Sequence, residues 1–80
     1  MFTELDLVRV NKLMQSDRPY SGTASVMHPP LIGDCGTIVH ITPGMPGNPS
    51  WCIVECLDQN GLTIWLADFS TEELERVKAV

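Results

Sequence analysis

The chain has few basic residues. It contains five Lys or Arg against ten Asp or Glu, which gives a formal net charge of −5. Nucleic-acid-binding proteins gain much of their affinity from basic side chains that neutralise phosphates, and anionic membrane surfaces attract the same side chains. Here the basic residues are also scattered among acidic ones. This balance argues against DNA, RNA or an acidic membrane as a partner.

The sequence also lacks long apolar runs and paired cysteines. No segment approaches the roughly 20 apolar residues that a membrane-spanning helix needs. The first ten residues, MFTELDLVRV, contain acids and lack the basic region that begins a secretory signal. Three cysteines, an odd number at positions 35, 52 and 56, do not make a disulfide framework. We therefore expect reduced thiols and a cytoplasmic protein.

The segments that are present predict one small β domain over residues 1–80. Alternating or apolar segments rich in β-branched residues predict strands at DLVRV, TIVHIT, WCIVECLD and LTIWLA. Ser70 and Glu73 have the spacing of a capping box, which predicts one helical turn. Residues 75–80 either continue that helix or form a short closing strand, and their alternation favours the strand.

Two loops rich in proline and glycine separate the predicted strands. The first covers residues 15–30 and contains Tyr20, and the second covers residues 43–50 and contains Met45. A loop of more than about 12–15 residues in a compact domain is often a binding element. Both loops are therefore candidates for contact with a partner.

The stretch LIGDCG predicts a tight turn before the second strand. Gly33 and Gly36 permit positive φ at little steric cost, and Asp34 can accept a hydrogen bond within its own turn. These conformational roles explain the segment without chemistry. They favour a structural interpretation of Cys35.

The hairpin around DQNGL determines which side chains share a face. A three-residue loop over 59–61 places Asp58 opposite Leu62 and pairs Leu57 with Thr63. This register gathers one apolar face from Cys52, Val54, Cys56, Leu62, Ile64 and Leu66. A two-residue turn at Asn60–Gly61 would set Cys56 beside Trp65 and mix the two faces. Burial therefore favours the first register.

In that register Trp51, Ile53, Leu57 and Trp65 lie on the outer face of the hairpin. A contiguous exposed apolar patch usually marks a contact site, and tryptophan is enriched at binding hot spots. Either a partner binds this face, or the long loop or the C-terminal segment covers it.

The ordered set of motifs resembles a known family. IGDCGTIVHI is similar to a G-D-x-G-T-V-V turn and strand, and it is followed by WCIVEC and by DQNGLTIWLADFSTEEL. This order resembles an uncharacterised family of short bacterial domains with an SH3-like, KOW-type barrel. The resemblance implies an all-β barrel of about five antiparallel strands with one short helical turn near the C-terminus. It implies no activity. Cys56 departs from the family pattern because it replaces an aromatic residue.

The candidates for chemistry are few. Cys35 and His40 are the one local pair of a thiol and an imidazole, five residues apart. Cys52 and Cys56 on one strand would lie roughly 13 Å apart at about 3.3 Å per residue, too far to bind one ion together. We expect no enzyme activity, no metal site and no cofactor.

The sequence therefore predicts a non-catalytic protein-binding module, either an adaptor or a blocker of its partner like an immunity protein or antitoxin. We expect it to self-associate through the outer face described above. The loops offer a second surface, because peptide-binding SH3 domains dock their partners between two loops against aromatic residues. Tyr20 and Trp51 are placed to line such a groove. Acidic residues near it, Asp17, Asp34 and Glu55, favour a basic partner. The alternative is a small-molecule- or metal-binding domain centred on Cys35 and His40.

Overall fold

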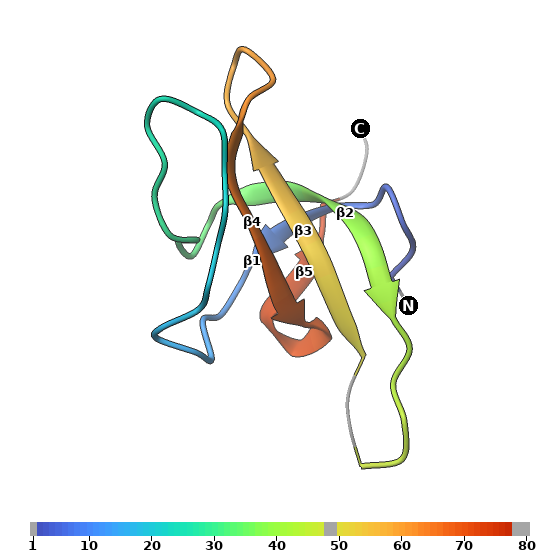
Figure 1. Ribbon diagram of the computed structural model, residues 1–80. Helices are drawn as coiled ribbons and strands as arrows, with labels where there is room; N and C mark the ends of the chain where they lie inside the picture. Colours follow the sequence, from blue (N-terminus) through green and yellow to red (C-terminus); the bar gives the residue numbers. More distant parts are fainter. Residues whose placement is uncertain (1, 48–49, 78–80) are drawn as a thin grey trace.

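The computed structural model describes residues 2–47 and 50–77, which form an all-β fold (Figure 1). Its elements are β1 (Leu7–Val10), β2 (Cys35–Thr42), β3 (Trp51–Leu57), β4 (Thr63–Ser70), the 3₁₀ turn η1 (Thr71–Glu73) and β5 (Leu74–Arg76). The strands form one sheet in the order β4-β3-β2-β1-β5, and every neighbouring pair is antiparallel. The predicted all-β fold of about five antiparallel strands with one short helical turn near the C-terminus is confirmed.

The C-terminal segment closes the sheet as a strand. Ser70 and Glu73 form the predicted capping box, which starts η1. The chain then extends, and β5 pairs with β1, with Leu74 opposite Val10. Strand structure is therefore confirmed for residues 75 and 76, while residues 78–80 lie outside the described residues.

The core lies between the strands and contains mostly medium-sized side chains. Its buried members are Val8, Val10, Ile38, Cys52, Val54, Cys56, Trp65, Ala67, Phe69 and Leu74. The rings of Trp65 and Phe69 pack at a tilt, with centroids 5.4 Å apart. Full burial of one large apolar side chain is worth about 1.5–3 kcal/mol, so these two rings carry a large share of a thin core.

The register between β3 and β4 differs from the prediction after its first pair. Leu57 pairs with Thr63 and the Asp58 N–H donates to the Leu62 carbonyl at 2.8 Å, as predicted. A bulge then shifts the register, so that Cys56 pairs with Trp65. The prediction that Trp65 lies on the outer face is wrong, because its side chain is fully buried. The bulge lets the largest side chain of the hairpin fill the core, while the half-buried Ile64 is left as the extra residue.

A second irregularity lies in β2. Ile38 pairs with Val54, and the next pair joins His40 to Ile53, so Val39 is the extra residue. Ile38 and Ile41 consequently both contact the core, whereas His40 is exposed beside Ile53. Strict alternation along TIVHIT would place His40 on the face of Ile38, and the bulge at Val39 makes that placement wrong.

The turn before β2 has the predicted glycine geometry. Gly33 adopts a φ of 96°, a conformation that favours glycine. Gly36 has another role, because a Cβ there would lie 2.7 Å from both the Glu55 carbonyl oxygen and a Val54 methyl group. The carboxylate of Asp34 accepts a hydrogen bond from the Leu31 N–H at 3.0 Å, within the turn.

The first loop runs beside β4 and covers part of its open edge (Figure 1). Ser21 and Leu66 exchange both main-chain hydrogen bonds, at 2.7 and 3.2 Å. The N–H groups of Thr23 and Ala24 both donate to the Thr63 carbonyl, at 2.8 and 2.9 Å. The loop is therefore attached to the sheet by its own main chain.

Candidate functional site

A buried ion pair holds the first part of the long loop against η1. The Arg18 guanidinium donates to Glu73, and both side chains are at least 96% buried. Glu73 also accepts main-chain N–H groups from Met14 at 2.8 Å and Ser70 at 2.9 Å. Burial would raise the pKa of Glu73, but the hydrogen bonds from Arg18, Met14 and Ser70 hold it below its usual range. The loop is thus fixed at Arg18, two residues before Tyr20.

The Arg18 side chain also packs on the core. Its guanidinium carbon lies 4.3 Å from the centroid of the Phe69 ring, a cation–π arrangement. Its Nε and Nη1 atoms have no hydrogen-bond partner among the described residues. The Arg18 charge is therefore committed to Glu73 and Phe69 rather than to solvent.

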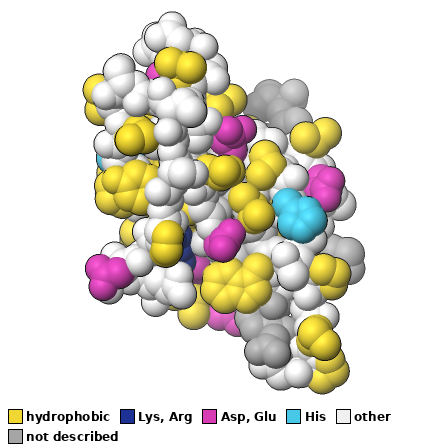
Figure 2. Space-filling model, in the orientation of Figure 1, with side chains coloured by type: hydrophobic (Ala, Val, Ile, Leu, Met, Phe, Trp, Pro, Cys, Tyr) yellow, Lys and Arg dark blue, Asp and Glu magenta, His cyan; other side chains and the backbone are white. Residues whose placement is uncertain are grey.

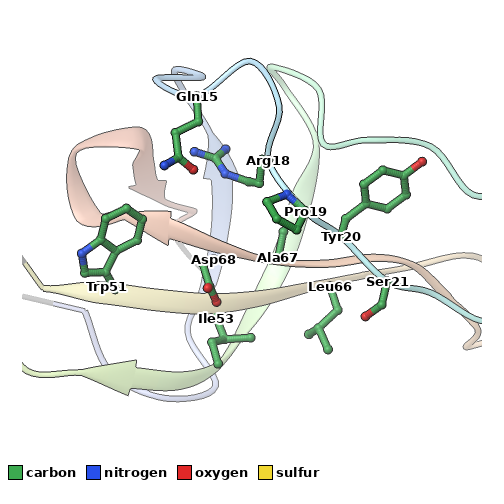
Figure 3. A pocket seen from close by; sticks show the side chains of 10 residues that line it. All are labelled: Gln15, Arg18, Pro19, Tyr20, Ser21, Trp51, Ile53, Leu66, Ala67 and Asp68. Atoms are coloured by element: carbon green, nitrogen blue, oxygen red, sulfur yellow. The ribbon is translucent and has the colours of Figure 1, made fainter.

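A groove of about 610 Å³ lies between this loop and the sheet (Figure 3). Loop residues 15–21 line one side, and β3 and β4 line the other. The lining residues are Gln15, Arg18, Pro19, Tyr20, Ser21, Trp51, Ile53, Leu66, Ala67 and Asp68. The walls are aromatic and aliphatic, with polar groups at a few points, which is the usual composition of a binding groove.

The groove has an acidic margin. Asp68 is exposed within it, and Glu55 follows Ile53 on β3, where its carboxylate accepts a hydrogen bond from the Thr63 hydroxyl at 2.6 Å. The one basic residue in the lining, Arg18, is already paired with Glu73. The face shown in Figure 2 likewise carries hydrophobic and acidic side chains and little visible Lys or Arg. The local charge therefore attracts cations.

The structure brings some of the predicted contact residues together and separates others. Tyr20, Trp51 and Ile53 all line the groove. Trp65 lies in the core on the opposite face of the sheet. Leu57 and Met45 are 50% and 69% exposed, and neither lines the groove.

Several groove residues were missed by sequence reasoning. Leu66 and Asp68 join Trp51 and Ile53 because of the bulge in β4, which no sequence pattern indicates. Arg18 gave no signal either, because a single charged residue in a polar loop is ordinarily solvated. Pro19 lies in the predicted proline-rich loop, but the sequence predicted no contact for it.

The alternative centre at Cys35 and His40 is not assembled as a cluster. Both side chains are exposed on β2, and five residues of strand span roughly 16 Å at about 3.3 Å per residue. His40 Nδ1 lies 4.0 Å from a Glu4 oxygen, and the Cys35 thiol lies 3.9 Å from the Gly33 carbonyl. Among residues 2–47 and 50–77, no three His, Cys, Asp or Glu side chains are grouped for metal binding.

The other two cysteines belong to the core. Burial raises the pKa of the Cys52 and Cys56 thiols, which keeps them protonated and weakly nucleophilic at neutral pH. Cys52 also lines a second hollow, of about 680 Å³, together with Phe2 near the N-terminus. The other residues that line this hollow are Ile41, Pro43, Gly44, Ser50, Thr71 and Glu72.

Comparison with protein-family models, curated proteins and solved structures gave no match for this chain. In the described part of the chain, no helix has the length and apolar composition needed to cross a bilayer.

Proposed function

We propose that this protein is a non-catalytic protein-binding module that holds an extended segment of its partner in the groove between the first loop and β3–β4. The observation that supports this most is the convergence of Tyr20, Trp51 and Ile53 on one groove, beside the exposed carboxylate of Asp68. Aromatic side chains at the two sides of a groove suit an extended peptide. The resemblance to SH3-like domains is in accord with this use.

The chemistry of the groove favours a basic partner. Asp68 and Glu55 would attract Lys or Arg side chains, and the face of an indole such as Trp51 binds cations as well. The net charge of −5 adds long-range attraction for such a segment. We propose a partner segment that carries at least one Arg or Lys among apolar residues.

The proposed role is that of an adaptor or a blocker of its partner, and the free thiols suit a cytoplasmic location. Self-association also remains a proposal, but the surface that would carry it differs from the predicted one. Trp65, one of the residues of the predicted self-association surface, lies in the core, so a second copy would have to use Trp51 and Ile53. A dimer and a peptide would then compete for the same residues.

A phage-displayed library of random decapeptides tests the proposed function. Peptides enriched on the native protein should contain Arg or Lys. Their affinity should fall at least about tenfold on Trp51→Ala, the size of loss typical of a hot-spot residue. The matched control is Leu57→Ala, an exposed residue of β3 outside the groove, which should leave binding unchanged.

Charge reversal tests the preference for a basic partner. Asp68→Lys should weaken the selected peptides, whereas Glu4→Lys, which changes net charge equally outside the groove, should have a much smaller effect. A library that yields no peptide dependent on Trp51 would contradict the proposed function.

A further inference from the structure

The open edge of β4 presents main-chain hydrogen-bonding groups to the groove. The N–H and C=O of Leu66 both bond to Ser21 of the loop, so they point away from β3. Along an antiparallel strand, every second residue directs its main-chain groups to the same side. The N–H and C=O of Asp68 consequently point to this open edge, where Asp68 lines the groove.

The loop leaves Asp68 without a main-chain partner. In the antiparallel register set by Ser21 and Leu66, the loop residue opposite Asp68 is Pro19. Proline has no N–H and cannot donate to the Asp68 carbonyl. No main-chain hydrogen bond joins Asp68 to the described residues of the loop.

The next position on this edge is already occupied. The N–H of Ser70 donates to Glu73 Oε1 at 2.9 Å, as part of the capping box. Asp68 is therefore the open position between Leu66, whose N–H and C=O are both paired, and Ser70, whose N–H is paired. An unpaired edge position of this kind is a template for another extended chain.

We propose that the partner segment binds by strand addition, with its main chain paired to the N–H and C=O of Asp68. This inference rests on the proposed function and specifies how the groove recognises its partner. Main-chain pairing supplies affinity, and side chains on alternate residues of the segment supply specificity. A basic side chain of the segment then meets the acidic margin of the groove, while apolar side chains contact Trp51 and Tyr20.

The occupant is a segment of another protein rather than a second copy of this chain. Pairing of two β4 edges about a two-fold axis would bring the two Asp68 carboxylates close together, and like charges across paired strands are destabilising. An acidic residue on an exposed edge is also a common means of preventing self-pairing. Charge complementarity therefore selects a basic foreign segment.

The test uses a decapeptide selected on the native protein as described above. The peptide is resynthesised with a single N-methyl group at each position in turn, which removes one main-chain donor at a time. Because Asp68 offers one main-chain acceptor on this edge, strand addition predicts a loss of roughly tenfold, the upper range for one hydrogen bond, at a single position of the peptide and small effects at the others.

Amide exchange of the protein gives a second measurement. In the free protein the Leu66 amide should be protected and the Asp68 amide should exchange fast. Saturation with the selected peptide should slow exchange at Asp68 by at least about tenfold. Because Asp68 is unaltered, this measurement does not depend on whether a variant folds.

The outcomes separate the two proposals. Peptides that need Trp51 but tolerate every N-methyl group, with Asp68 exchange unchanged, would overturn strand addition and leave peptide binding intact. Protection of Asp68 that rises with protein concentration alone, together with a dimer in light scattering, would overturn the inference by identifying a second copy as the occupant.

Discussion

The indole N–H of Trp65 donates a hydrogen bond to the carboxylate of Asp34 at 2.9 Å. This bond joins the largest buried side chain of β4 to the turn that precedes β2. The same carboxylate oxygen accepts the Leu31 N–H, so one side chain shapes the turn and satisfies the core. A buried tryptophan needs such a partner for its N–H.

Removal of the Asp34 carboxylate should destabilise the fold. Asp34→Ala leaves the Trp65 N–H without its acceptor, at a cost of about 1–3 kcal/mol in the free energy of unfolding. Urea denaturation followed by tryptophan fluorescence measures this loss. The exposed loop residue Asp17 serves as control, and Asp17→Ala should change stability by less than about 0.5 kcal/mol. Equal effects of the two substitutions would show that the Asp34–Trp65 bond contributes nothing.

The two tryptophans should respond oppositely to a charge. Trp65→Glu places a carboxylate in the core and should abolish folding, because burial of an unpaired charge costs several kcal/mol. Trp51→Glu changes a half-buried groove residue and should leave the sheet intact. Far-ultraviolet circular dichroism and thermal unfolding distinguish them. A folded Trp65→Glu protein would mean that the register of β3 and β4 is not the one described.

Removal of one partner of the Arg18–Glu73 ion pair should destabilise the protein more than replacement of both partners by apolar residues. Glu73→Gln leaves the Arg18 charge buried without its counterion and should cost about 3–5 kcal/mol. The double variant Arg18→Met, Glu73→Leu removes both charges together and should lose much less stability. Denaturant titration of the three proteins checks this. A double variant no more stable than Glu73→Gln would assign the effect to the hydrogen bonds that Glu73 accepts from Met14 and Ser70.

The same pair should make stability depend on pH in the acid range. The folded-state pKa of Glu73 is below its ordinary value of 4.5, so the unfolded chain takes up its proton first as pH falls. The contribution of Glu73 is therefore fully present above that value and is lost as pH decreases through the folded pKa. Denaturation midpoints measured from pH 6 downward should fall less steeply for Glu73→Gln than for the native protein. Parallel curves would contradict this assignment.

Sequence patterns predicted the elements well because each element has a local cause. Turn residues such as Gly33 and the capping pair Ser70 and Glu73 act within a few positions of the chain, and their structures are as predicted. The strand segments likewise show their own composition. The strands form one antiparallel sheet, in accord with the predicted all-β fold.

Sequence patterns failed where the cause is not local. The bulges at Val39 and Ile64 are the result of competition between side chains for one core, and strict alternation cannot represent an extra residue. The groove was predicted only in part for the same reason. Tyr20 and Trp51 line the groove, whereas Arg18 is held in place by Glu73, which is 55 residues away in the sequence.

The bulge at Ile64 decides which side chains of β4 face the core. Because Ile64 is an extra residue, Trp65 lies opposite Cys56 and points inward, and Asp68 lies on the acidic margin of the groove. If Ile64 were instead paired with Cys56, every later side chain of β4 would exchange faces. Deletion of Ile64 would therefore not invert the strand. It would remove the bulge and leave Leu57 opposite Thr63 and Cys56 opposite Trp65, so at this one point the hairpin can lose a residue and keep its inside and its outside.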